Sequence, residues 1–594
     1  MTFPDRFILR NVACRLCVAM VTLCLGGSCA NSLAMADAPT VSHVFPAGIQ
    51  RATDATVTCG GKFDWPLNVW SSAGSVTVGE EKGQLTITAP EDLMADRIWL
   101  RLYNGEGATS PIPFLVGNLP ELSETEPNDS PAKAQQVAPS VSGDGVAATI
   151  NGVLKKNGDV DSFAVTLAEG ETLVAAVAAN THFGSPMDAI LQVVSPEGTV
   201  LAENHDDVGI DPRLAFACRK SGTYVVRIFA FPASPNQQIR FHGGDSYVYR
   251  LTLTTGPYIT HAVPTAVPLD AEALSESNRV EPRGWNVPKK ARLPVSRPFD
   301  STVDSTVDST VDSAVGRQEE FEDNGMGQDP RSRLGFLHAA GWAGSARICV
   351  VPYAVECLAE TTSVKDPMVV LPPVAISGTI RERGATDHFR LPLKKSVAYK
   401  IAVESVRLDS PLVPLLRLTD PGGKVVAEVR ENVAADDATI SHTAALDGDY
   451  QLMIRDRYTH GGERYFYRLS VVPQSADFRL TLAADSYVVA PNQPLEIPVS
   501  VARQSGAGDA ITDITVEAID LPPGVSCSPV TSTAKGETAK AVTLKLETDG
   551  TSFAGPIRIR GTAAEQEIKR FAKTPAKFRA CFDSFWLTTR PGTK

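Results

Sequence analysis

The chain of 594 residues lacks several features that assign many proteins to a class directly. Apart from one run near its start, no stretch approaches the ~20 apolar residues that a membrane-spanning helix needs. The formal net charge is −12. There is no run of basic residues, which argues against nucleic acid as a partner.

Signatures of catalysis are also missing. The sequence contains no His-Glu-x-x-His, no Gly-x-Ser-x-Gly and no Gly-rich phosphate loop, and its nine histidines are scattered singly. His205 beside Asp206 and Asp207 is the most suggestive group, because a carboxylate can orient a histidine base. No nucleophile is marked nearby, so we interpret the triplet as a polar turn and predict a protein that is not an enzyme. Paired carboxylates of the glycosidase type stay open, because their separation is spatial.

Cysteine spacing gives no metal or redox motif. Cys-x-x-Cys pairs and zinc spacings do not occur among the six cysteines after residue 36. Cys527 and Cys581 fall in the same final segment, which makes them the favoured disulfide pair, with a buried free thiol as the alternative for each. The six are Cys59, Cys218, Cys349, Cys357, Cys527 and Cys581.

The first 36 residues have the pattern of a bacterial export signal. Arg6, Arg10 and Arg15 form a basic region, an apolar run follows at 16–25, and Ala34-Met-Ala36 supplies an A-x-A cleavage site. We therefore expect an exported protein without a transmembrane segment, located in the periplasm, on the cell surface or outside the cell.

The remainder alternates short apolar runs with Gly and Pro turns. Residues 85–88 and 97–103 show the period of two that half-buried strands require, and the runs at 161–167, 172–177 and 222–229 are further strand signals. This pattern predicts an all-β chain of tandem β-sandwiches, immunoglobulin-like and jelly-roll-like, with no catalytic α/β domain. Pro46-Ala-Gly48 followed by Ala55–Gly61 resembles the opening of IPT/TIG-type immunoglobulin-like domains.

Oxygen-bearing side chains cluster in the stretch from Ser123 to Phe163. Glu124, Glu126 and Asn128 follow one another at every second residue, and Asp159 and Asp161 repeat that spacing about thirty residues later. Calcium takes six to eight oxygen ligands, often from separate segments. A solvated Pro-Asn-Asp turn between two domains would use the same residues.

Five separated motifs make residues 121–256 resemble the bacterial pre-peptidase C-terminal domain, a jelly-roll-like sandwich. The resemblance implies that Glu124, Glu126, Asn128, Asp159 and Asp161 occupy calcium-ligand positions, with Asp129 as an addition. The motifs are Glu126-Pro-Asn-Asp129, Asp159-x-Asp161-x-Phe163, Asp188-x-x-Leu-x-Val-x-Ser-Pro-x-Gly198, Asp206-Asp207 and Gly222-x-Tyr224.

A second copy of this pattern follows 218 to 226 residues later, which indicates a duplicated domain. Gly461-Gly-Glu-Arg-Tyr-Phe-Tyr-Arg-Leu469 matches Gly243-Gly-Asp-Ser-Tyr-Val-Tyr-Arg-Leu251. The copy loses most of the acidic set, because Glu360, Thr362, Val364, Ala385 and Asp387 stand where the first copy has its five oxygen ligands. We expect no calcium site there.

Between the copies, a degenerate TIG-like segment carries four units of the Asp-Ser-Thr-Val type from Asp300 to Val315, which we interpret as a disordered insertion. The predicted organisation is therefore a signal at 1–36, a TIG-like sandwich at 37–120, the first copy at 121–256, a TIG-like domain at 257–358 with its insertion at about 289–330, the second copy at 359–474, and an Ig-like sandwich at 475–594.

These features favour an exported, non-catalytic binding, adhesion or scaffold protein that recognises an extracellular polymer or protein. Tyr247 and Tyr249, with Tyr465 and Tyr467 in the second copy, are either a binding face or core residues. A peptidase-associated protein and a purely structural spacer of the cell envelope remain the alternatives.

Overall fold

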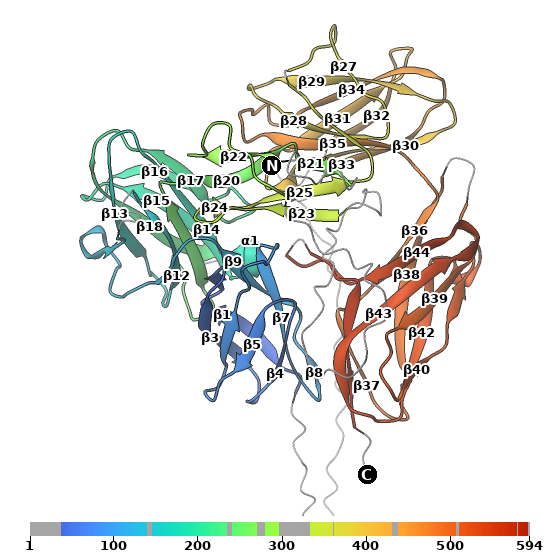
Figure 1. Ribbon diagram of the computed structural model, residues 1–594, viewed down its shortest axis with the longest axis horizontal. Coiled ribbons are helices and arrows are strands. Elements are labelled where there is room, and N and C mark those ends of the chain that lie inside the picture. Colours follow the sequence, from blue (N-terminus) through green and yellow to red (C-terminus); the bar gives the residue numbers. More distant parts are fainter. Residues whose placement is uncertain are drawn as a thin grey trace, which may run out of the picture. The chain divides into compact units, whose positions relative to one another are not determined.

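The computed structural model describes residues 37–138, 145–234, 240–269, 279–295, 333–359, 361–430, 437–506, 510–578 and 580–591 (Figure 1). Regular structure in these ranges is almost entirely strand, which confirms the all-β prediction of tandem sandwiches. The predicted signal at 1–36 and the four-residue repeat lie outside the described residues. Within the described ranges, no helix is long and apolar enough to cross a membrane.

The first two sheets enclose a core that includes Ile49, Leu85 and Phe114. One sheet has the order β1 (Thr40–Phe45), β3 (Asp54–Lys62), β6 (Gln84–Thr88) and β5 (Ser75–Val78). The other has the order β2 (Gly48–Gln50), β9 (Ile112–Gly117), β7 (Arg97–Asn104) and β4 (Asn68–Ser71), with β8 (Gly107–Ala108) beside β7.

The next two sheets contain the first copy of the duplicated pattern. One has the order β10 (Glu121–Ser123), β12 (Ala147–Val153), β19 (Val248–Thr254), β14 (Thr172–Ala178) and β17 (Arg213–Ala217). The other has the order β11 (Gln135–Gln136), β13 (Asp161–Leu167), β18 (Gly222–Pro232), β15 (Met187–Val194) and β16 (Val200–Asn204). The short helices are η1 (Pro131–Lys133) and α1 (Asn180–Phe183).

The third pair of sheets is smaller, with three strands in each sheet. One sheet has the order β22 (Glu281–Trp285), β20 (Tyr258–Val263) and β24 (Ala343–Gly344). The other has the order β21 (Ala266–Pro268), β25 (Ala346–Val351) and β23 (Arg333–Leu337). The register shift between Val41 and His43 in β1 recurs between Ile259 and His261 in β20. Opposite each shift a glycine has positive φ, Gly61 at 154° and Gly284 at 152°, and a Cβ there would lie 2.1 Å from the Thr40 carbonyl oxygen or 1.9 Å from that of Tyr258.

The second copy repeats the strand order of the first, element by element. One sheet is β26 (Ala354–Cys357), β28 (Val374–Thr379), β35 (Phe466–Pro473), β30 (Ala398–Glu404), β33 (Ala438–Thr443). The other is β27 (Met368–Val369), β29 (Thr386–Leu393), β34 (Gly448–Asp456), β31 (Pro414–Thr419), β32 (Val425–Arg430). The helix η4 (Val406–Leu408) follows β30 as α1 follows β14.

The last strands form one ten-stranded sheet around a core of its own. Strand β38 shows why the sequence pattern was informative, because its residues alternate between buried and exposed along most of its length. The main order is β37 (Ser486–Val489), β45 (Ser584–Thr589), β43 (Phe553–Ala563), β44 (Ile568–Lys573), β36 (Asp477–Leu482), β38 (Leu495–Gln504), β42 (Ala541–Thr548) and β40 (Val525–Cys527), with β39 (Ile514–Ile519) paired to β43 and β41 (Val530–Ser532). Two further 3₁₀ turns are η5 (Glu537–Ala539) and η6 (Ala564–Gln566).

Candidate calcium site

Two connections that cross between the sheets of the first copy bring the predicted residues together. β10 lies in one sheet and β11 in the other, so the segment between them, 124–134, passes from sheet to sheet. The segment between β12 and β13 makes the same crossing. The first crossing carries Glu124, Glu126 and Asn128, whereas Asp159 and Asp161 come from the end of the second.

Three carboxylates converge at this point. One oxygen each of Glu126, Asp159 and Asp161 lies within 4.8 Å of the other two. Asp159 and Asp161 are completely buried, while Glu126 is exposed and closes the cluster from the solvent side. Buried like charges at this spacing repel one another unless protons or a cation neutralise them.

The buried side chain of Asn128 adds a fourth polar group. Its backbone N–H donates to Glu126 Oε2 over 3.0 Å. One atom of its amide lies 3.3 Å from both Glu126 Oε2 and Asp161 Oδ1. With nitrogen at that place the amide donates to both carboxylates, whereas with oxygen there it completes a ring of oxygens that only a cation would stabilise.

Glu124 lies beside this ring and contacts one of its members. Its Oε1 accepts the backbone N–H of Val153 at 2.8 Å, and its Oε2 lies 2.9 Å from the Tyr249 hydroxyl. The same hydroxyl lies 2.6 Å from Asp161 Oδ2. Glu124 also shares a side-chain hydrogen bond with Asp161 directly, so both carboxyl groups and Tyr249 form one network. The closest group of oxygens is still that of Glu126, Asp159 and Asp161.

The turn before β13 fixes Asp159. Its Oδ2 accepts the backbone N–H groups of Lys155 and Lys156 at 2.6 and 3.3 Å. Its buried Oδ1 has the ammonium group of Lys156 at 3.5 Å as an ion-pair partner. Asp129 also turns toward Lys156, at 3.3 Å, and thus faces that lysine at the rim.

Burial and mutual repulsion dominate the electrostatics. Burial, followed by the charge of Glu124, raises the pKa of Asp161 to about 10, and burial also raises the pKa of Glu124. Burial and the two carboxylates raise the pKa of Tyr249, which keeps its hydroxyl protonated as a donor. A divalent cation would oppose this effect, because it favours the charged form of its carboxylate ligands.

The second copy keeps the scaffold and loses the ring. Asp387 Oδ2 accepts from the Tyr467 hydroxyl at 2.6 Å, as Asp161 does from Tyr249. Ala385 replaces Asp159, Thr362 Oγ1 accepts the backbone N–H of His388 at 2.7 Å, and the side chain of Val364 is 72% exposed. Glu360 lies outside the described residues.

The other predicted groups are dispersed. His205 and Asp206 form an exposed pair at 3.1 Å, whereas buried Asp207 binds Arg213 at 2.7 Å and also pairs with Arg464. The triplet therefore does not form a joint site in this structure.

The four predicted tyrosines fall into two pairs that differ in burial. Tyr249 and Tyr467 are wholly buried core residues, which settles the alternative for these two. Tyr247 and Tyr465 are partly buried and pack against the same cores.

The predicted disulfide is wrong. Cys527 carries a free thiol at the end of β40, and its Sγ lies 3.7 Å from the carbonyl oxygen of Ser528. The sequence placed Cys527 and Cys581 in one segment, but it could not show how the fold places them. Cys527 ends β40, whereas Cys581 lies outside the strands, just before β45.

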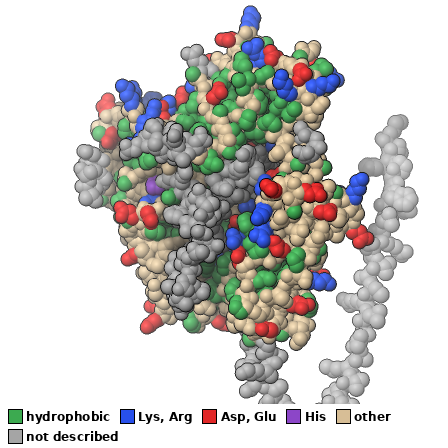
Figure 2. Space-filling model, turned by 45° about the vertical axis from the view of Figure 1, so that its right-hand side comes forward, with side chains coloured by type: hydrophobic (Ala, Val, Ile, Leu, Met, Phe, Trp, Pro, Cys, Tyr) green, Lys and Arg blue, Asp and Glu red, His purple; other side chains and the backbone are tan. Residues whose placement is uncertain are grey.

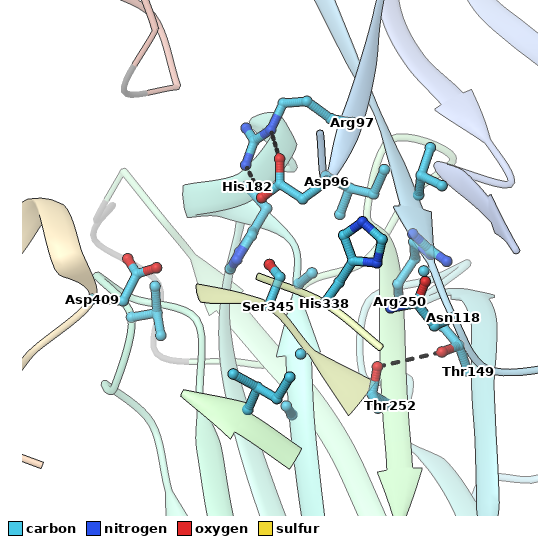
Figure 3. A pocket seen from close by; sticks show the side chains of 18 of the residues that line it. Asp96, Arg97, Asn118, Thr149, His182, Arg250, Thr252, His338, Ser345 and Asp409 are labelled. Carbon is cyan, nitrogen blue, oxygen red and sulfur yellow. Dashed lines mark hydrogen bonds and ion pairs between the residues drawn. The ribbon is translucent and has the colours of Figure 1, made fainter. Parts of the chain in front are cut away.

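A polar cavity of about 180 Å³ is the site that sequence reasoning missed (Figure 3). Asp96 pairs with Arg97 at 2.8 Å on its wall, and Arg250 is paired with Glu121. Since these arginines are already neutralised by carboxylates of the chain, we assign no ligand to the cavity.

No protein-family model and no curated protein matches the chain. Solved structures match weakly. A periplasmic inhibitor of g-type lysozyme from Aeromonas hydrophila is 14% identical, with a TM-score of 0.15, over 23% of this chain and 97% of its own. The first four Ig domains of Dscam1 isoform 9.44 are 9% identical, with a TM-score of 0.18, over 93% and 99%. The CUB1-EGF-CUB2 fragment of human MASP-1/3 is 9% identical, with a TM-score of 0.13, over 55% and 99%.

Proposed function

We propose that this chain is an exported, non-catalytic binding or scaffold protein whose first duplicated sandwich is clamped by calcium. The observation that carries the proposal is the convergence of Glu126, Asp159, Asp161 and Asn128 where two sheet-crossing connections meet. Four oxygen donors from two segments, two of them buried carboxylates, suit a hard cation that completes its shell with water.

Calcium would act on the fold rather than on a reaction. The crossing that carries Glu126 and Asn128 is held mainly by the short parallel pairings of β10 with β12 and β11 with β13. A cation shared with Asp159 and Asp161 would tie this crossing to the body of the sandwich. Bound ligand stabilises by mass action, by about 2.7 kcal/mol at a hundredfold excess over the dissociation constant.

The test is thermal melting of the mature chain in calcium and in chelator. We expect a higher melting temperature in calcium. Asp159→Ala should remove the difference, and this substitution is well matched because the second copy folds with Ala385 at the same position. Thr362→Ala in the second copy is the control that should keep the calcium effect. An equal melting temperature of the parent protein with and without calcium would end the calcium proposal.

Binding of an extracellular polymer or protein is the second part of the proposal. It is supported by the tandem sandwiches, which present much surface for recognition. The mature protein should be retained on at least one immobilised polymer from a panel of collagen, neutral glucan and acidic polysaccharide. Retention on none would favour the structural spacer, and proteolytic activity lost on His205→Ala would favour the peptidase-associated alternative.

A further inference from the structure

The loop between β34 and β35, residues 457–465, is called the aromatic loop below. It carries Tyr458, whose side chain is 54% exposed. Among the Phe, Tyr and Trp residues whose burial the structure describes, Tyr458 alone is exposed rather than buried or half-buried. A bare aromatic ring on a protein surface is a frequent mark of a binding site, because such rings supply much of the contact energy.

Two more rings and a guanidinium extend this surface. The centroid of the Tyr458 ring lies 6.2 Å from that of His460, which lies 5.8 Å from that of Tyr465. The guanidinium carbon of Arg457 lies 5.6 Å from the Tyr458 centroid. The loop thus presents a row of three rings with a cation at one end.

The aromatic loop is held in place from below. Asp456 is buried, and its Oδ2 accepts the backbone N–H groups of Tyr458 at 2.8 Å and His460 at 2.9 Å. The Thr459 carbonyl oxygen accepts the N–H of Gly384 at 3.0 Å. A Cβ on Gly461 would lie 2.3 Å from the backbone of Glu382, so the loop sits directly on the 381–384 turn. Binding on a loop fixed in this way loses little conformational entropy.

Arginines outnumber the exposed carboxylates on the aromatic loop and on the turn beneath it. The turn beneath the loop contributes exposed Arg381 and Arg383, which join Arg457, against the exposed Glu382 and Glu463. The surface that faces the viewer at the top of Figure 2 carries hydrophobic, basic and some acidic side chains together. The local charge therefore favours an anionic partner.

The backbone of the aromatic loop argues against a peptide strand as that partner. The N–H groups of Tyr458 and His460 bind Asp456, and that of Gly462 binds the carbonyl of Ile380 at 2.9 Å. A peptide that adds to a sheet edge needs free backbone donors and acceptors. The loop offers ring faces and guanidinium groups instead.

We propose that the aromatic loop binds an acidic polysaccharide. The C–H face of a pyranose ring would stack on Tyr458, since the face of an aromatic ring is electron-rich. Sugar carboxylates would meet Arg457 and Arg383, because guanidinium and carboxylate groups form strong charge-assisted hydrogen bonds. This inference rests on the proposed binding function and names its substrate class.

The first copy supplies an internal contrast. Its corresponding connection leaves β18 and docks on the same turn, where Gly158 N–H donates to the Phe241 carbonyl at 3.0 Å. The Phe241 ring packs on Phe229 and Phe231, with centroids 4.4 and 5.5 Å apart. Phe241 thus packs on two rings of β18, and Tyr247 packs on the core, so we assign the ligand to the second copy alone.

Affinity electrophoresis and calorimetry of the mature chain with polygalacturonate test the proposal, with dextran as the uncharged comparison. We expect binding to polygalacturonate that weakens as salt increases. Tyr458→Ala should weaken it about tenfold, Tyr458→Phe should retain it, and Arg457→Gln should reduce both the affinity and its salt dependence. Val425→Ala, at an exposed position of β32 in the same copy, should leave binding unchanged.

Several outcomes would overturn the proposal. Equal binding of dextran would remove the requirement for acidic sugar, and equal competition by polyglutamate would point to an acidic peptide. Undiminished binding by Tyr458→Ala would place the site elsewhere. If the protein is retained on collagen but not on polygalacturonate, this inference fails while the proposed binding function stands.

Discussion

The two copies of the duplicated sandwich share a scaffold and differ in what their connections carry. In both, a glycine of an inner strand lies against a buried tyrosine. The hydroxyl of this tyrosine donates to the first aspartate of a strand in the other sheet, Tyr249 to Asp161 and Tyr467 to Asp387. The acidic ring is added to this unit in the first copy only. The comparison indicates that the shared core specifies the fold, while the ligands vary on segments that the core leaves free.

A second difference concerns a buried arginine. Arg250 and Arg468 occupy equivalent places on β19 and β35, but their carboxylate partners come from different elements. Arg250 pairs with Glu121 of β10, and Arg468 pairs with Glu404 at the end of β30. After duplication, the charge that neutralises the same arginine was supplied from another strand.

Removing the carboxylate partner of a buried arginine should lower the stability of the protein more than the other changes proposed here. Glu404→Ala should destabilise the protein by about 3–5 kcal/mol, because it leaves the buried Arg468 without its carboxylate. Glu121→Ala should cost less, since Glu121 is 19% exposed and Glu404 is 7% exposed, which lets water replace more of the lost interaction. Denaturant unfolding of the two variants gives the difference. Equal losses would show that the two partners are energetically interchangeable.

The next largest loss of stability should come from changing the glycine that each copy places against its buried tyrosine. A Cβ on Gly152 would lie 2.2 Å from the Tyr249 ring, and one on Gly378 would lie 2.3 Å from the Tyr467 ring. Either Gly→Ala substitution should destabilise its sandwich by about 1–3 kcal/mol through overpacking. Gly152→Ala should also abolish the calcium effect, because the added carbon would lie 2.5 Å from Glu124 Oε2. Calorimetry should show similar losses of stability for the two variants. A loss in only one of them would show that the two glycines are not equivalent.

These comparisons show what the sequence could and could not predict. The bounds of β13 follow from period-two alternation, and the acidic set was recognisable because Glu124, Glu126 and Asn128 are close in the chain. The sequence could not predict that Arg250 pairs with Glu121 whereas Arg468 pairs with Glu404. The pairing of strands that are far apart in the chain decides which carboxylate lies beside each arginine. The same limit explains the wrong Cys527–Cys581 pair. It also explains why the contact between Glu124 and Tyr249 was not predicted, since these residues are 125 positions apart in the chain.

Grafting the ring into the second copy would sharpen the comparison. Ala385→Asp with Thr362→Glu and Val364→Asn restores the residue types of the first copy at the matching positions. At a calcium concentration ten times the dissociation constant, the triple variant should gain about 1.4 kcal/mol. Calcium-dependent melting of a background that carries Asp159→Ala isolates the new site. The graft with Ala385 retained is the control, and a calcium response there would show that an aspartate at this position is not required for the calcium effect.

The smallest expected effect is the pH dependence of stability that arises from Asp387 in the second copy. Burial raises the pKa of Asp387 to about 6, against the opposing hydrogen bond from Tyr467. The unfolded carboxyl loses its proton near pH 4, while the folded one keeps it to about pH 6, so stability should decrease over that interval and level off above it. The decrease should be on the order of 1–2 kcal/mol. Asp387→Asn should flatten this part of the profile, because the amide stays neutral and can still accept from Tyr467, whereas Asp449→Asn on the surface should leave it unchanged. A profile that keeps its slope in Asp387→Asn would assign the decrease to another group.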